Sequence, residues 1–140
     1  MQFLSPRDSQ RDSQRLSSTT RGIPLVDGLA LEDIDYFEIH EAFAGTVLAT
    51  LAAWEDADFC RERLGLDGAF GKVDRAKLNV NGSSLAAGHP FAATGGRIVA
   101  TLAKQLHERT AAGDLGRPAR GLISVCAAGG MGVVAVLEGR

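Results

Sequence analysis

One histidine, His89, stands where both of its neighbours restrict the backbone. Gly88 permits angles that other residues avoid and Pro90 fixes its own, so together they predict a tight, stiff turn that presents the ring. A lone histidine is more often a satisfied core residue. In the stretch 79–97, however, small residues crowd both flanks and leave room for a substrate or a second backbone. This setting favours a chemical role for His89.

Cys126 is the second residue whose position suits chemistry. It ends a predicted strand, 122–126, and opens a predicted turn of small residues, 127–132, so its sulfur is expected to face a site with backbone N–H groups nearby. The alternative is a small buried hydrophobe, the usual role of a free cysteine. Spacing alone does not decide between the two.

The elements that must position these groups follow from periodicity. Residues 36–39 predict a short buried strand that His40 closes, and the apolar residues of 43–54 recur at three- and four-residue spacing, which predicts a helix. Strand, polar tip and helix together place a side chain at the carboxyl end of a sheet, where open α/β folds keep their sites. A second helix is predicted from Thr94, as its cap, through Leu106, and a hairpin of strands 122–126 and 133–137 ends the chain.

Three short motifs occur in order along the chain: His-Glu-Ala-Phe-Ala at 40–44, Gly-His-Pro at 88–90 and Cys-Ala-Ala-Gly-Gly at 126–130. In this order they resemble the thiolase family, over about residues 23–138. The resemblance covers only part of the C-terminal catalytic half of a thiolase. It implies an α/β fold, a mixed sheet with helices on both faces. The first strand–helix unit, which we expect to occupy the middle of the sheet in relatives, is absent.

The resemblance also implies a reaction and roles. The family transfers acyl groups between 3-oxoacyl-CoA and coenzyme A, giving acetyl-CoA and a shortened acyl-CoA in the degradative direction. His89 would activate the nucleophilic cysteine and help to hold the thioester oxygen, and Cys126 would exchange a proton with the substrate carbon or thiol. His40 takes the place of an asparagine that positions a water in one oxyanion site. The backbone N–H of Ala128 would help to form the second oxyanion site. The supporting motif residues are Glu41, Gly88, Pro90 and Gly129.

One departure from the family outweighs the others. The acylated cysteine lies in the N-terminal half of thiolases, which this chain lacks together with the coenzyme-A-binding loop domain, and Cys60 has none of the expected small-residue setting. We therefore expect the chain alone to be inactive and only marginally folded. The alternatives are a split enzyme, whose nucleophile another chain supplies, and a non-catalytic fragment or binding subunit that keeps the fold.

The resemblance further indicates subtype and partners. His-Glu-Ala-Phe and a long connector at 55–77 resemble the β-subunits of multifunctional fatty-acid-oxidation complexes. The expected substrates are acyl-CoA and coenzyme A, with no tightly bound cofactor. The expected protein partners are a thiolase N-terminal half or a second copy, with a hydratase/dehydrogenase α-subunit as a further candidate.

Composition sets the remaining expectations. The 140 residues, 45% of them hydrophobic, suit one packed domain, and a net charge of −2 gives no electrostatic case for nucleic acid or an anionic membrane surface. No apolar run approaches the roughly 20 residues of a transmembrane helix. Two cysteines favour a reducing compartment, taken here as the cytoplasm. Residues 1–22 are polar and of low complexity and are predicted to be disordered. Asp8 and Asp12 argue against a mitochondrial transit peptide.

Two further patterns are set aside. Residues 130–135 fit the dinucleotide fingerprint Gly-x-Gly-x-x-Ala, but β-branched residues follow where that motif needs a helix. A metal site built from His40, His89 and Cys126 lacks any local ligand spacing, so no metal is expected. The domain is accordingly predicted to span 23–140.

Overall fold

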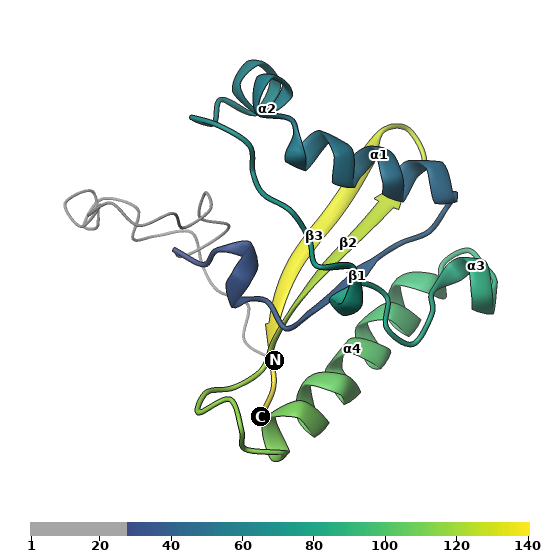
Figure 1. Cartoon of the computed structure of the whole chain (residues 1–140). Helices are drawn as coiled ribbons and strands as arrows, with labels where there is room; N and C mark the ends of the chain where they lie inside the picture. The colour runs from purple at the N-terminus through teal and green to yellow at the C-terminus, as the bar shows by residue number, and fades with distance from the viewer. Residues whose placement is uncertain (1–27) are drawn as a thin grey trace.

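A short mixed sheet forms the centre of the computed structural model, which describes residues 28–140 (Figure 1). Its strands are β1 (Tyr36–Ile39), β2 (Arg120–Ala127) and β3 (Met131–Glu138), hydrogen-bonded in the order β1-β2-β3. β1 runs parallel to β2, and β2 runs antiparallel to β3 as the predicted hairpin. The predicted segment 1–22 and the expected domain start at 23 lie outside the described residues.

Side chains alternate between the two faces of the sheet, because successive residues of a strand point to opposite sides. Phe37 and Ile39 of β1 pack with Leu122 of β2 in one buried cluster. Tyr36 of β1 and Ile123 of β2 belong to the second cluster, on the other face. Each face is apolar, so each face requires a cover.

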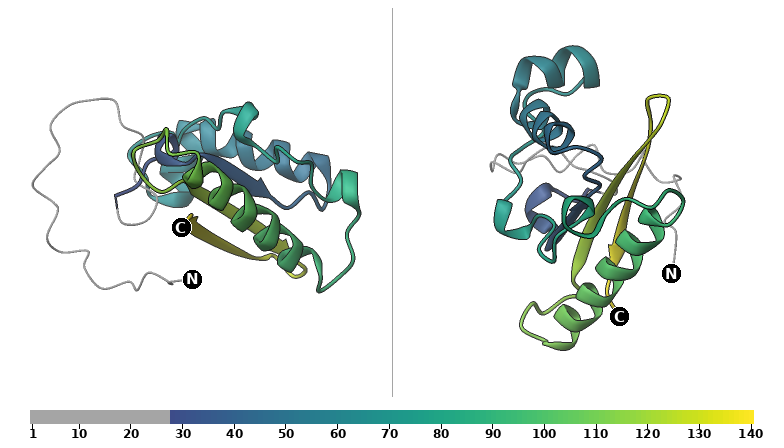
Figure 2. Two further views of the ribbon diagram at one scale, coloured as in Figure 1. Left: turned by 90° about the horizontal axis from the view of Figure 1, so that it is seen from below. Right: turned by 90° about the vertical axis from the view of Figure 1, so that its right-hand side faces the viewer.

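A helix supplies each cover. α1 (Ala44–Glu55) contributes Val47 and Leu51 to the first cluster, and α4 (Thr94–Ala111) contributes Ile98, Leu102 and Leu106 to the second. Figure 2 shows α1 and α4 on opposite sides of the sheet. The predicted mixed sheet with helices on both faces is confirmed.

Shorter elements fill the connections. α2 (Ala57–Leu64) continues from α1, and α3 (Ser84–Ala87) precedes the Gly-His-Pro turn. Two turns of 3-10 helix are also present: η1 (Leu31–Asp33) precedes β1 in sequence, and η2 (Arg75–Lys77) follows α2. No helix within 28–140 combines the length and apolar character that crossing a membrane requires.

Among the described residues no strand lies between β1 and β2. Every residue of β1 pairs directly with β2, from Tyr36 with Gly121 to Ile39 with Ser124, so no strand fits between them. The outer edge of β1 is partly occupied by a bridge from Phe37 to Leu78. Within the described residues β3 pairs only with β2, which leaves its outer edge without a strand partner.

The apolar stripe expected on α1 is narrower than predicted. Val47 and Leu51 are buried, but Phe43 is 74% exposed and Leu48 is 53% exposed. These two side chains point away from the short strand that α1 covers, since a four-residue β1 offers little surface to a helix of 12 residues. The α4 side chains Ile98, Leu102 and Leu106, which we expected to be less well covered without the N-terminal half, are fully buried, so that expectation was wrong.

Candidate active site

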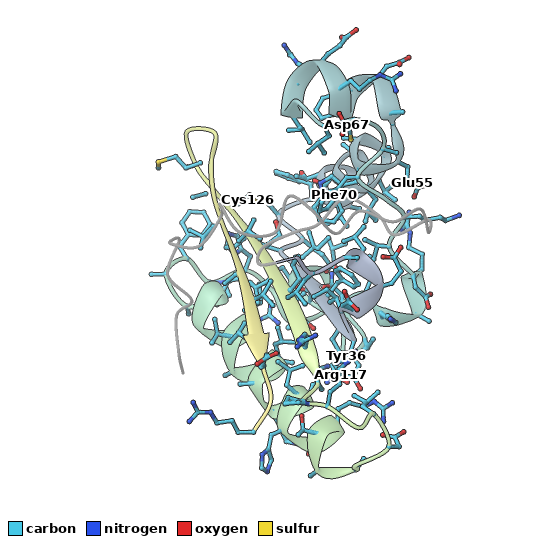
Figure 3. All side chains as sticks on the ribbon, turned by 90° about the vertical axis from the view of Figure 1, so that its left-hand side faces the viewer. Tyr36, Glu55, Asp67, Phe70, Arg117 and Cys126 are labelled. Carbon is cyan, nitrogen blue, oxygen red and sulfur yellow. The ribbon has the colours of Figure 1, made fainter. Side chains whose placement is uncertain are left out.

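His40 and Cys126 meet because β1 and β2 are parallel and end at the same edge of the sheet. The backbone N–H of His40 donates to the carbonyl of Ser124 at 2.8 Å, which extends the pairing by one residue beyond β1. Cys126 lies two residues further along β2. Its Sγ is 3.4 Å from Nδ1 of His40, although the two residues are 86 positions apart in sequence. Figure 3 shows Cys126 toward the hairpin end of the sheet and Tyr36 with Arg117 at the opposite end.

His89 completes the cluster from the loop between α3 and α4. Gly88 before it has a φ of 86°, an angle that favours glycine, which explains the Gly-His-Pro motif. Nδ1 of His89 lies 3.2 Å from Nε2 of His40, and the two ring centroids are 4.4 Å apart. The exposed ring of Phe91 lies against the other side of His89, with centroids 4.9 Å apart.

Thr94, the first residue of α4, holds His89 in place. Its Oγ1 is 2.7 Å from Nδ1 of His89 and 3.1 Å from the carbonyl oxygen of Pro90. Thr94 is 2% exposed and makes no side-chain cap of α4, so the predicted capping role was wrong. Its hydroxyl instead contacts His89 and Pro90 of the Gly-His-Pro turn.

Asn79 and Glu41 tie the end of β1 to the loop that carries His89. The amide of Asn79 accepts from the N–H of Ile39 at 2.9 Å and donates to the Ile39 carbonyl at 3.0 Å and to Glu41 Oε1 at 2.8 Å. The other oxygen of Glu41 accepts from the N–H of Leu85, in α3, at 3.0 Å. Glu41 is therefore a positioning residue, and it fixes the spacing between His40 and His89.

Burial controls the charge state of His40. Its side chain is 3% exposed, and burial, assisted by the positive charge of His89, lowers the pKa of the His40 imidazole. Cys126 is half-buried and His89 is exposed. The site thus has a closed end at His40 and an open end at His89, where a substrate could enter.

Glu38 lies on the opposite face of β1 from Phe37 and Ile39, toward α4. It is 1% exposed, and neither carboxyl oxygen has a hydrogen-bond partner among the described residues. Burial raises the pKa of Glu38 to about 7; the charge of Arg97 opposes this rise and that of Glu41 adds to it.

Ala128 and Gly129 lie in the exposed turn that joins β2 to β3. Gly129 has a φ of 83°, so the turn needs glycine there. Within residues 28–140 no hydrogen bond joins Ala128 to His40 or His89.

Cys60 lies apart from the cluster, on α2. It is fully buried, its thiol lies 3.3 Å from the carbonyl of Ala53, and its sulfur accepts from the N–H of Phe70 at 3.4 Å. These contacts give Cys60 a structural role.

The sequence motifs did not reveal Thr94 and Asn79. Thr94 stands five residues after His89, at the start of the predicted helix, and Asn79 opens the same stretch of small residues. In the part of the chain that the structure describes, no group of three or more His, Cys, Asp or Glu side chains is placed to hold a metal ion.

The cluster joins a thiol to two imidazoles in a line, Cys126–His40–His89, with a hydroxyl at its end. Thiols and imidazoles exchange protons near neutral pH, so this line is suited to general acid–base chemistry.

Comparisons with known proteins point to one family. The family model described as "Thiolase, C-terminal domain" matches residues 19–139. A "Probable 3-ketoacyl-CoA thiolase" of Caenorhabditis elegans is 49% identical over 89% of the chain, which covers 27% of that relative. A "3-ketoacyl-CoA thiolase" of Pectobacterium atrosepticum is 47% identical over 79% of the chain and 24% of the relative.

Two solved structures are also similar. A peroxisomal 3-ketoacyl-CoA thiolase of Saccharomyces cerevisiae, described as built from two core domains of identical topology, superposes with a TM-score of 0.53 and 34% identity. This match covers 79% of the chain and 25% of that structure. A dimeric peroxisomal thiolase of the same yeast gives a TM-score of 0.52 and 35% identity, over 78% of the chain and 21% of that structure. The chain spans about a quarter of the length of the relatives it matches.

Proposed function

The chain belongs to the thiolase family, and from this premise we propose that it supplies the acid–base groups of a 3-ketoacyl-CoA thiolase. The reaction is acyl transfer between a 3-oxoacyl-CoA and coenzyme A. The observation that carries the proposal is the contact of Cys126 and His89 with the two nitrogens of one buried imidazole, at 3.4 Å and 3.2 Å. Both acid–base groups of the reaction are thereby held at one edge of the sheet.

In the proposed reaction, His89 takes the proton from a nucleophilic cysteine that the N-terminal half supplies. That cysteine forms a bond to the 3-keto carbon, and the bond between the second and third carbons of the acyl chain breaks. Cys126 gives its proton to the departing carbon, which leaves as acetyl-CoA. The Cys126 thiolate then takes the proton of an incoming coenzyme A thiol, whose sulfur attacks the acyl-enzyme. The bond from the acyl carbon to the nucleophilic cysteine breaks, the shortened acyl-CoA leaves, and that cysteine recovers its proton from His89.

The oxygen of the reacting carbonyl gathers negative charge in these steps, which positioned donors stabilise. His89 is proposed to donate to the thioester oxygen, with a water held by His40. The backbone N–H of Ala128 is proposed to serve the second oxyanion site, since Ala128 lies in an exposed turn two residues after Cys126. No tightly bound cofactor enters the reaction.

The proposed partners follow from what this chain does not supply. They are acyl-CoA and coenzyme A, a thiolase N-terminal half or a second copy, and a hydratase/dehydrogenase α-subunit. Exposed apolar side chains at the site edge and just before α1 support a protein partner there: Phe91 is 85% exposed and Phe43 74%. We also propose a cytoplasmic location, which the two free cysteines favour.

Co-expression tests the proposal. The full chain would be produced together with a thiolase N-terminal half that carries the nucleophilic cysteine, and thiolysis of acetoacetyl-CoA would be measured. We expect activity from the pair and none from either chain alone. His89→Ala should lower acyl-enzyme formation by about 10²–10⁴-fold, the usual value of a general base.

Cys126→Ser separates the two steps, because a hydroxyl titrates far above neutral pH. The acyl-enzyme should still form from a preformed thioester, while carbon–carbon cleavage fails. His107→Gln, at an exposed histidine on α4 remote from the cluster, is the matched control and should behave as wild type. A folded pair without thiolysis would contradict the proposal and favour a binding subunit that keeps only the fold.

A further inference from the structure

His40 has a titratable partner at each ring nitrogen. Nδ1 faces the sulfur of Cys126 at 3.4 Å and Nε2 faces Nδ1 of His89 at 3.2 Å. The ring is 3% exposed, and burial is the main cause that lowers its pKa, so near neutral pH it carries a single N–H. A neutral imidazole donates from one nitrogen and accepts at the other. If His40 donates its N–H to one of these partners, the other partner must donate a proton to the bare nitrogen of His40.

We propose that His40 couples the protonation state of Cys126 to the tautomer of His89. With Cys126 as a thiol, S–H donates to Nδ1 of His40, and Nε2–H of His40 donates to Nδ1 of His89. His89 then carries its proton on Nε2 and is a donor toward the open site. With Cys126 as a thiolate, His40 donates from Nδ1 to the sulfur and accepts at Nε2 from Nδ1–H of His89. Nε2 of His89 then carries no proton and can act as a base.

The exchange between the two states balances. The S–H bond breaks as the Nδ1–H bond of His40 forms, and the Nε2–H bond of His40 breaks as the Nδ1–H bond of His89 forms. The Nε2 proton of His89 passes to solvent or substrate. The site loses one proton in total, and no ring holds a positive charge in either state.

Thr94 accommodates both states. Its hydroxyl is 2.7 Å from Nδ1 of His89 and 3.1 Å from the Pro90 carbonyl. When Nδ1 of His89 bears a proton, this N–H is shared between Nε2 of His40 and the hydroxyl, and the hydroxyl donates to Pro90. When Nδ1 is bare, the hydroxyl rotates and donates to the ring, where it shares the Nδ1 lone pair with Nε2–H of His40. The Pro90 carbonyl keeps other donors in that case, the N–H groups of Ala93 and Thr94 at 3.1 and 3.2 Å.

The thiolase resemblance places an asparagine at this position. An asparagine cannot reverse in this way, because its amide nitrogen only donates and its oxygen only accepts. Besides His89 and Cys126, the charged groups acting on His40 are Arg97 from α4 and Glu41 from the end of β1. The catalytic use of the coupling rests on the proposed function: His89 would be a base while Cys126 is a thiolate and an oxyanion donor while Cys126 is a thiol. The coupling itself requires no reaction.

Nitrogen NMR of the chain tests the coupling, because the shifts of Nδ1 and Nε2 report which nitrogen of a ring bears the proton. A His107→Gln background leaves only the rings of His40 and His89 among the chain's 3 histidines. Cys126→Ser offers a hydroxyl donor in place of the thiol, and Cys126→Asp offers a carboxylate that only accepts, in place of the thiolate. His89 should be Nε2–H in the serine variant and Nδ1–H in the aspartate variant.

Adding His40→Asn to both variants is the decisive control, since the two should then show one and the same His89 tautomer. Purely electrostatic communication would shift the His89 pKa without moving the proton between its nitrogens. If Cys126→Asp does not fold, the native thiol is ionised by raising the pH, and the same exchange of His89 signals is expected. One tautomer throughout, or a difference that persists with His40→Asn, would overturn the proposal. Because thiolysis is not measured, failure here leaves the proposed function to its own test.

Discussion

Glu38 should make the fold less stable as the pH rises through neutrality. The folded-state pKa of about 7 exceeds the ordinary 4.5, so between these values the folded chain holds a proton that the unfolded chain has released. Stability is therefore full below about pH 4.5 and is lost as the pH rises to 7 and above. A pKa displaced by this much corresponds to roughly 3 kcal/mol, a large share of the 5–15 kcal/mol that holds a typical domain together.

Glu38→Gln removes this loss, because the amide has nearly the shape of the carboxyl group and cannot ionise. Neither Glu38 oxygen has a partner among the described residues, so the substitution breaks no hydrogen bond there. We expect equal stability of variant and wild type near pH 4.5 and a variant more stable by up to roughly 3 kcal/mol at pH 8. The acid-side contribution of His40 is common to both proteins and cancels in the difference.

Urea unfolding between pH 4.5 and 8 measures the effect, followed by the fluorescence of Trp54, the single tryptophan, which packs on Phe70. Glu62→Gln is the matched control: Glu62 is exposed on α2, and its variant should keep the pH dependence of the wild type. The reasoning would be refuted if Glu38→Gln followed the wild-type curve. A less stable variant at pH 8 would refute it too, since the carboxylate would then be partnered.

Two further substitutions test the frame of the site. Asn79→Ala removes the three side-chain hydrogen bonds that Asn79 makes, two to Ile39 of β1 and one to Glu41, and leaves alanine at a φ of 47°. The variant should be less stable by about 1–3 kcal/mol in urea and should show faster amide exchange at 84–88. Its neighbour Asn81 is exposed, and a cost no greater than that of Asn81→Ala would contradict the bracing role. Leu102→Ala, at a fully buried α4 residue packed on β2, should cost about 2–5 kcal/mol. Leu48→Ala, on the exposed side of α1, should change thermal stability little, and similar melting temperatures for the two would disprove the packing described.

The long elements were predictable from sequence because their periodicity is local. Strand 36–39 was predicted with the bounds of β1, and the helix beginning at Thr94 and the terminal hairpin both form. The predicted helix over 43–54 is α1, displaced by one residue. α3 was not predicted, since a helix of four residues has too few turns to show a period.

What depends on distant contacts could not be read from the residues. Nothing near Phe43 in sequence indicates that β1 is too short to cover it, and nothing near Glu38 indicates that its carboxyl group is enclosed by α4. The proximity of His40, His89 and Cys126 followed from the thiolase resemblance, not from spacing. Their chemical roles stay predictions. The hydroxyl of Thr94 was misassigned because a threonine before a helical pattern normally caps it, whereas here the neighbouring imidazole takes the hydroxyl.

The parallel pairing of β1 with β2 has a consequence for the order in which the chain folds. The β2–β3 hairpin joins neighbours in sequence, whereas His40 and Cys126 are separated by 86 positions. Closing so long a loop costs chain entropy before any contact rewards it, so such pairings tend to form late. A folding intermediate with the hairpin and α4 in place but β1 undocked would hold most of the secondary structure and none of the site. The site therefore forms together with the least local contact of the fold, and it would be among the first features lost on unfolding.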